Sequence, residues 1–196
     1  MENLLESLLS NFDNNSLQEL GKQANLSPKQ AKGAMESAIP LLMSALSKNS
    51  STEEGATQLQ NAINRDHDGS ILDNLGGFLQ NPQMANGAGI LRHVLGNKQN
   101  NATAYVSKSS GVSTSSAAKI LEIAAPMIMG FLGKKSSSNQ STGINDILGS
   151  LLSSSTKPSK KNQSIITKLL DQDGDGDIMD DISKIGTSFL GRLFKK

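Results

Sequence analysis

The chain contains no cysteine and no tryptophan, and its 196 residues include only one tyrosine and five phenylalanines. Without cysteine it has no disulfide bonds, thiolate metal ligands or cysteine nucleophile. Because aromatic residues make up 3% of the sequence, the core has to be built from leucine, isoleucine, alanine and methionine. Such residues suit closely packed helices better than a β-sandwich, whose strands favour valine, threonine and aromatic residues. We therefore expect an all-α protein.

The sequence also lacks an excess of charge of either sign. Nineteen Lys and Arg residues against eighteen Asp and Glu residues give a net charge of +1, which provides no attraction to nucleic acid or to an anionic membrane. The longest apolar stretch, 117–132, is interrupted by Lys119, Glu122 and Pro126 and is shorter than the roughly 20 residues of a membrane span. The first residues do not have the pattern of a signal peptide. We expect a cytoplasmic protein.

What the sequence does contain is an internal repeat. With a shift of 86 positions, residues 20–51 align with 106–137 without a gap, and eleven of these 32 positions are identical, Ser27/Ser113 and Pro40/Pro126 among them. With a shift of 107, residues 64–75 align with 171–182, which implies an insertion of 21 residues around 134–164. These matches predict a tandem duplication into two quasi-equivalent helical units, 1–86 and 87–196, with a flexible Ser/Lys-rich insertion in the second.

Apolar residues recur at helical spacing in both units. The strongest start signal is Ser27-Pro28-Lys29-Gln30, where a capping serine precedes a proline in the first turn and a glutamine that completes a capping box. The helix that starts there contains Pro40, and its counterpart from Ser113 to Leu132 contains Pro126, so we expect a kink or a break in each. Further helices are predicted over 4–12, 16–24, 54–63, 71–79, 90–95, 103–109, 144–152 and 178–194.

Three segments resemble a known bacterial family. They read Gly-Ile-Leu-Arg-His-Val-Leu-Gly at 89–96, Val-Ser-Lys-Ser-Ser-Gly-Val-Ser at 106–113 and Ala-Ala-Pro-Met-Ile-Met-Gly-Phe-Leu-Gly at 124–133. Together with the acidic loops described next, they resemble the family catalogued as domain of unknown function 937. The resemblance covers most of the chain and implies a bacterial source and an all-helical fold. That family has no established activity, so the resemblance assigns no catalytic residue.

Residues 171–182 follow the pattern of an EF-hand calcium loop, which has oxygen ligands at positions 1, 3, 5, 7 and 12 and glycine at position 6. The residues at these places are Asp171, Asp173, Asp175, the carbonyl of Asp177 and Gly176. Position 12 is Ile182 in place of glutamate, and Asp180 or Asp181 offers the last carboxylate. We expect Ca²⁺ here, or Mg²⁺ as a substitute inside a cell.

The first copy of this loop carries fewer charges. Its candidate ligands are Asn64, Asp66, Asp68, the carbonyl of Ser70 and Asp73. We therefore expect weaker cation binding at this loop than at 171–182. The alternative for both loops is a solvent-exposed turn in which Asp68/Ser70 or Asp175/Asp177 caps the next helix.

Two further chemistries receive less support. Segments 17–35 and 103–121 loosely resemble a helix-turn-helix, but Lys29, Lys32 and Lys119 are the only lysines on the supposed reading helices, and the neutral charge argues against DNA. For catalysis the sequence offers His67, expected in a loop facing solvent, and His93 on a helix. Neither belongs to a catalytic motif, so we expect that the protein is not an enzyme and has no organic cofactor.

The sequence thus indicates a structural or self-associating interaction protein with cation-stabilised loops, whose partner is another protein or a second copy of the chain. The alternative is a calcium-responsive binding module. The C-terminal helix predicted over 178–194 also has the pattern of a membrane-surface helix, but its register repeats that of 71–79. A repeated helix is more simply a packing element, so a membrane partner is not favoured.

Overall fold

The structure, a computed structural model, describes residues 4–138 and 143–155. Every regular element in these two ranges is helical and none is a strand, which confirms the all-α prediction. The elements are α1 (Leu4–Leu9), α2 (Asn14–Ala24), α3 (Pro28–Asn49), α4 (Glu53–Asp66), α5 (Ser70–Asp73), α6 (Leu75–Gln80), η1 (Pro82–Ala85), α7 (Gly87–Leu95), η2 (Gly96–Lys98), α8 (Gln99–Ser110), α9 (Thr114–Ser138) and α10 (Ile144–Ser155).

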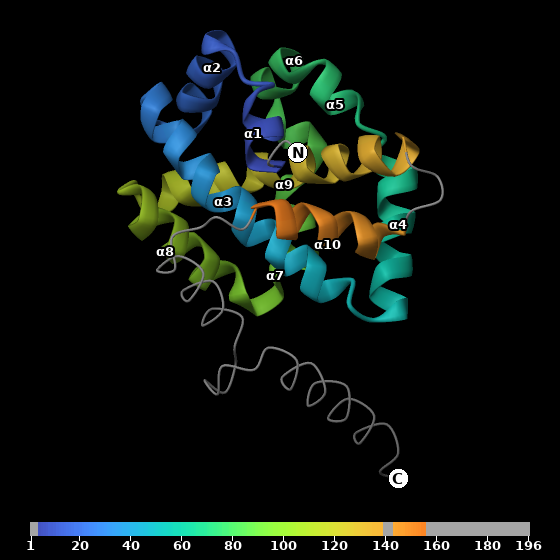
Figure 1. Cartoon of the computed structure of the whole chain (residues 1–196). Coiled ribbons are helices and arrows are strands. Elements are labelled where there is room, and N and C mark those ends of the chain that lie inside the picture. The colour runs from blue at the N-terminus through green and yellow to red at the C-terminus, as the bar shows by residue number, and fades with distance from the viewer. Residues whose placement is uncertain (1–3, 139–142, 156–196) are drawn as a thin grey trace. The chain divides into compact units, whose positions relative to one another are not determined.

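The two long helices, α3 and α9, pack against each other at the centre of this body (Figure 1). Small buried residues line both of them, among them Ala34 and Ala38 on α3 and Ala117 and Ala124 on α9. Small side chains allow two helix backbones to approach closely, and the larger leucine, isoleucine and methionine side chains fill the remaining space. The core is therefore built from the residue types that the composition predicts.

Pro40 and Pro126 lie inside α3 and α9, and both helices continue through them. Of the two expected outcomes, a kink or a break, the break into two helices does not occur. A proline removes one hydrogen bond of the helix ladder and strains the preceding turn. Packing on all sides offsets this cost, because the flanking residues Ile39 and Leu41 on α3 and Ala125 and Met127 on α9 are buried.

Helix α9 is the most deeply buried element. By length and composition it is apolar enough to cross a membrane, but 83% of its most apolar window is covered by the rest of the structure. It contacts α3, α7, α8 and α2 as well as α4, α5 and α10. An amphipathic surface helix has one apolar face, whereas a helix surrounded by others is apolar on all sides. The composition of α9 follows from this central position.

The caps of α3 and α9 repeat at an interval of 86 residues. Ser27 accepts a hydrogen bond from the backbone N–H of Gln30 and Ser113 from that of Ser116. Two residues before each cap, Asn25 and Gly111 adopt left-handed backbone conformations, with φ of 55° and 66°. The next residues close matching turns, with Leu26 N–H donating to the Gly21 carbonyl and Val112 N–H to the Ser107 carbonyl. The predicted start signal at Ser27 is thereby confirmed, including the reciprocal bond that Ser27 N–H donates to the side-chain oxygen of Gln30.

Several helix bounds differ from the sequence-based expectation, and two of these differences are the largest. The helix predicted over 71–79 is divided at Asn74, whose side chain accepts a hydrogen bond from Gly77 N–H and caps α6. Asparagine competes with the helix ladder in this way, so α5 ends and α6 begins at one residue. Helix α9 runs beyond Leu132 to Ser138, and α10 covers 144–155, so the described part of the insertion is largely helical.

Helices from both halves of the sequence share this core. Contacts group residues 1–156 into one compact unit, in which α3 from the first half packs on α7, α8 and α9 from the second. The predicted repeat units, 1–86 and 87–196, stay a prediction, because residues 156–196 lie outside the described ranges. The helix predicted over 178–194 lies outside them as well.

Candidate functional site

A groove with a volume of about 870 Å³ lies between α4 and α7. The turn 67–69, α5 and η1 close one end of it, and the end of α3 contributes Leu46 and Asn49. We refer to it as the α4–α7 groove. Its size is within the range of roughly 300–1,000 Å³ that is usual for ligand sites.

Apolar and polar residues line the groove in similar proportion. Leu46, Leu59 and Met129 are buried and come from α3, α4 and α9, whereas Ile71, Ile90 and Val94 are half-buried. Met84 on η1 also lines the groove and is 86% exposed, which makes it the one large apolar residue mostly in solvent among those whose side chains the structure describes. A site that combines buried apolar residues with an exposed methionine offers apolar surface to a partner.

One face of helix α4 lines the groove. Gly55, Leu59 and Ala62 follow one face at helical spacing and all line the groove. A Cβ atom on Gly55 would lie 1.9 Å from the carbonyl oxygen of Asn49, so the glycine allows α4 to begin close to the end of α3. Thr52 caps the helix by accepting a hydrogen bond from Gly55 N–H. The amide of Asn49 in turn donates to the carbonyl of Val94 over 2.9 Å and joins α3 to α7.

The turn between α4 and α5 packs directly on α9. A Cβ atom on Gly133 would lie 1.8 Å from the carbonyl oxygen of His67, and one on Gly130 would lie 2.5 Å from the side chain of Ile71. Gly69 adopts φ of 99°, a conformation that side-chain-bearing residues rarely adopt. Gly130 and Gly133, at the end of the segment 124–133 that resembles the family, thus form the surface on which this turn rests.

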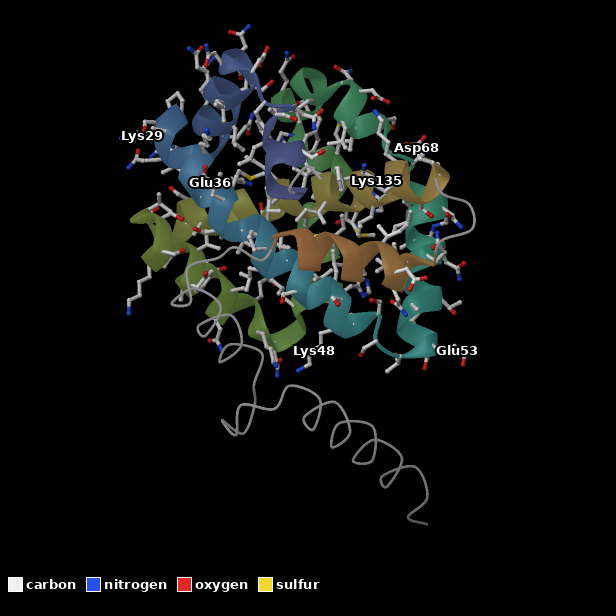
Figure 2. All side chains as sticks on the ribbon, in the orientation of Figure 1. Lys29, Glu36, Lys48, Glu53, Asp68 and Lys135 are labelled. Atoms are coloured by element: carbon white, nitrogen blue, oxygen red, sulfur yellow. The ribbon has the colours of Figure 1, made fainter. Side chains whose placement is uncertain are left out.

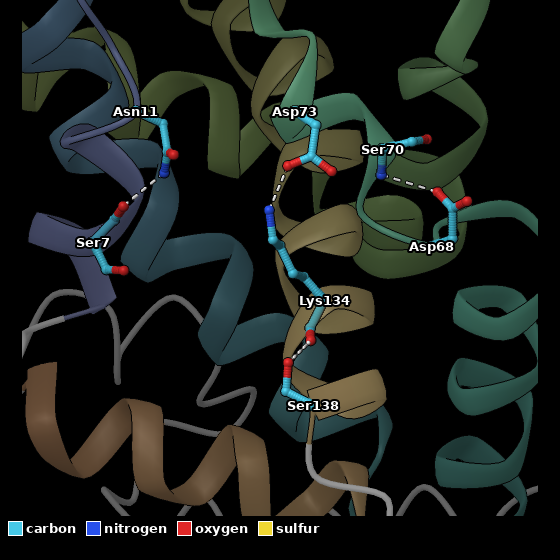
Figure 3. A network of polar contacts seen from close by, with 7 residues as sticks. All are labelled: Ser7, Asn11, Asp68, Ser70, Asp73, Lys134 and Ser138. Atoms are coloured by element: carbon cyan, nitrogen blue, oxygen red, sulfur yellow. Dashed lines mark hydrogen bonds and ion pairs between the residues drawn. The ribbon is translucent and has the colours of Figure 1, made fainter.

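Polar contacts fix the same turn (Figure 3). Asp68 accepts a hydrogen bond from Ser70 N–H over 3.0 Å, and Asp73 forms an ion pair with Lys134 of α9. Arg65 and Asp66 are paired at 2.7 Å. Hydrogen bonds from Arg65 hold the pKa of Asp66 below its usual value, and hydrogen bonds from Ser70 do the same for the pKa of Asp68. Both carboxylates are therefore ionised at neutral pH.

Both histidines of the chain line the α4–α7 groove. His67 was expected to face solvent, but it is half-buried beside α9, and this burial lowers the pKa of its imidazole. His93 lies exposed on α7. Sequence reasoning missed the convergence of the two residues, because they are 26 positions apart and no local pattern relates them.

Four candidate ligands of the first acidic loop have partners within the protein. Helix α4 continues through Asp66, so only residues 67–69 separate it from α5. Asn64 accepts from Gln60, Asp66 pairs with Arg65, Asp68 accepts from Ser70 and Asp73 pairs with Lys134. No group of three or more acidic or histidine side chains within 4–138 and 143–155 is placed to hold a metal ion. Asp68 and Ser70 form a turn, α5 has no side-chain cap at Gly69, and cation binding at this loop stays a prediction.

The stronger calcium candidate, 171–182, lies outside the described residues. Asp171, Asp173, Asp175, Asp177, Asp180 and Asp181 therefore stay sequence-based predictions.

The two segments that resemble a helix-turn-helix correspond to α2–α3 and α8–α9. The supposed reading helix α3 packs on other helices along one side. Ser110 of α8, for example, donates to the carbonyl of Gly33 and to the hydroxyl of Ser37. Lys29 and Lys32 at its start are exposed, while Ala31, Ala34 and Met35 are buried. Such packing leaves little of α3 to enter a DNA groove.

Comparison with known proteins assigns the chain to a family. A family model described as "Bacterial protein of unknown function (DUF937)" matches residues 6–135, two-thirds of the sequence and the whole stretch from α1 to the Gly130–Gly133 surface of α9. No curated protein and no solved structure matches the chain. The chain therefore belongs to the bacterial DUF937 family.

Proposed function

We propose that this protein is an interaction protein that holds an apolar segment of a protein partner in the α4–α7 groove. The observation that carries the proposal is the groove itself, with Leu46, Leu59 and Met129 at its base and Met84 exposed at its edge. An exposed methionine suits a contact surface because its flexible, polarisable side chain adapts to different apolar partners.

A comparison of the two halves supports an open binding surface at α7. The 86-residue repeat makes α7 the counterpart of α1. Helix α10 packs directly on α1 and α3. Helix α4, in contrast, packs on α9 and α10, and the groove separates it from α7. Helix α10 thus covers α1, whereas the groove leaves the corresponding part of α7 open. Apolar residues of α7 such as Ile90 and Val94 therefore remain available to a partner.

Two substitutions on α4 test the proposal. Ala62→Arg places a long charged side chain in the groove, whereas Asn61→Arg adds the same group at an exposed position of α4 that does not line the groove. Random peptides displayed on phage are selected against the full chain. We expect peptides that bind the wild type and Asn61→Arg but not Ala62→Arg. Selection without any peptide that distinguishes the two variants contradicts the proposal.

The same variants decide between a different protein and a second copy as the occupant. In sedimentation velocity we expect the wild type and both variants to sediment alike. A wild-type oligomer that Ala62→Arg dissociates and Asn61→Arg does not would make a second copy the occupant and would contradict the proposal of a separate partner.

The proposal has two further parts that rest on sequence. The first is a tandem duplication of the helical unit, supported by the identical interval between the caps of α3 and α9. The second is a structural Ca²⁺ ion in the loop 171–182, supported by three aspartates and a glycine at EF-hand positions. We assign the protein no catalytic activity and place it in the bacterial cytoplasm.

A further inference from the structure

We propose that the segment bound in the α4–α7 groove carries a basic side chain at each end of its apolar stretch. This inference rests on the proposed function and specifies the chemistry of the partner. It follows from where the charges of the groove lie, and in particular from which of them are already neutralised within the protein.

One charge pair at the groove is internal. Arg65 and Asp66 both line it, and the guanidinium donates to the carboxylate through two nitrogen atoms, at 2.7 and 2.9 Å. Such a two-point contact neutralises both groups locally. Asp66 is consequently a poor anchor for an incoming cation.

Two carboxylates remain beside the groove. Asp68 lines it and is held by the backbone of Ser70, with no ion pair among the described residues. Glu54 does not itself line the groove but accepts a hydrogen bond at 3.0 Å from Gln58, which does. Neither contact neutralises its carboxylate, because both donors are uncharged. Each site therefore favours a positive charge on the partner.

The two carboxylates lie at opposite ends of α4. Glu54 is in its first turn and Asp68 follows its last residue, and Figure 2 shows Glu53 and Asp68 at the two ends of the helix. At 1.5 Å per residue the separation along α4 is roughly 20 Å. Basic residues on the partner would be about 14 positions apart in a helix or about six apart in an extended segment. Between them, apolar side chains meet Leu59, Ile90 and Val94.

The experiment is a display selection followed by binding measurements. Random peptides of about 16 residues, long enough for roughly 20 Å in helical form, are selected on the full chain and counter-selected on Ala62→Arg. Peptides that bind the wild type but not Ala62→Arg are called groove-dependent. We expect Lys and Arg to exceed Asp and Glu several-fold at the ends of these peptides. For one such peptide, Asp68→Asn and Glu54→Gln should each weaken binding about three- to tenfold. Glu36→Gln serves as the control, since Glu36 is exposed on α3 and does not line the groove.

A charge exchange makes the test independent of folding effects. Binding of the peptide with its basic residue replaced by glutamate should be weak to the wild type and restored, at least in part, by Asp68→Lys. The absence of any groove-dependent peptide overturns the proposed function and this inference together. Groove-dependent peptides that lack basic ends, and whose binding is unchanged by Asp68→Asn and Glu54→Gln, overturn this inference alone.

Discussion

Gly133 gives the sharpest test of how the turn 67–69 rests on α9. A Cβ atom at this position would lie 1.8 Å from the carbonyl oxygen of His67, whereas real Cβ atoms essentially never approach within 3.0 Å of another heavy atom. In Gly133→Ala the turn must therefore retreat by more than about 1 Å, because the atom it meets is backbone and cannot rotate away.

The size of the effect follows from two opposing terms. Replacement of a helical glycine by alanine is worth about 1 kcal/mol in favour of the folded state. Overpacking against backbone typically costs about 1–3 kcal/mol, and we place this site at the upper end since the overlap exceeds 1 Å. We expect a net loss of about 2 kcal/mol in the free energy of unfolding.

Gly33 provides a matched control. It lies inside α3, and a Cβ atom there would meet nothing within 4 Å. Gly33→Ala should therefore stabilise the protein by about 0.5–1 kcal/mol through helix propensity alone. Thermal unfolding followed by far-UV circular dichroism should separate the two variants by about 8 °C, at roughly 3 °C per kcal/mol for a domain of this size. Equal Tm values for the two variants would refute the contact between the turn and α9.

Three further predictions concern other parts of the chain. Ser27→Ala removes the side-chain half of the capping box and should lower stability by about 1 kcal/mol, while Ser27→Asn should retain most of it; a urea titration that finds both variants as stable as the wild type would refute the role of the cap. Burial lowers the pKa of His67 in the folded state, so the unfolded chain binds a proton more readily. Stability should thus fall as the pH decreases from about 7 to 5, and His67→Gln should reduce that slope; an identical slope contradicts the assignment. Calorimetric titration with Ca²⁺ up to about 1 mM should give heat with the wild type and much less with Asp173→Asn or Asp175→Asn, whereas a silent wild type leaves the capped turn as the role of loop 171–182.

Features encoded by neighbouring residues could be predicted from the sequence. The capping box at Ser27, the repeated turn before Ser113 and the two long helices all depend on patterns within a few positions. The division at Asn74 also has a local cause, but asparagine within an apolar helical pattern does not by itself reveal whether its side chain will cap or face solvent.

The α4–α7 groove could not be predicted in this way. It depends on how far α4 lies from α7, and that distance is set by glycine contacts between segments far apart in the chain, such as Gly133 with His67. In the sequence, glycine at position 133 is as consistent with a helix end as with a docking surface. The same limit explains the burial of His67. Its local sequence predicts exposure to solvent, whereas the contact with α9 leaves it half-buried.

Methionine methyl NMR tests the central claim most directly, since the chain carries seven methionines as probes. A groove-dependent peptide is added to the full chain with labelled methionine methyl groups. We predict that the signals of Met84 and Met129, which line the α4–α7 groove, shift on binding, while those of Met35 and Met43, buried in α3 away from it, stay in place. Shifts at Met35 or Met43 without any at Met84 would show that the peptide binds elsewhere and would contradict the account.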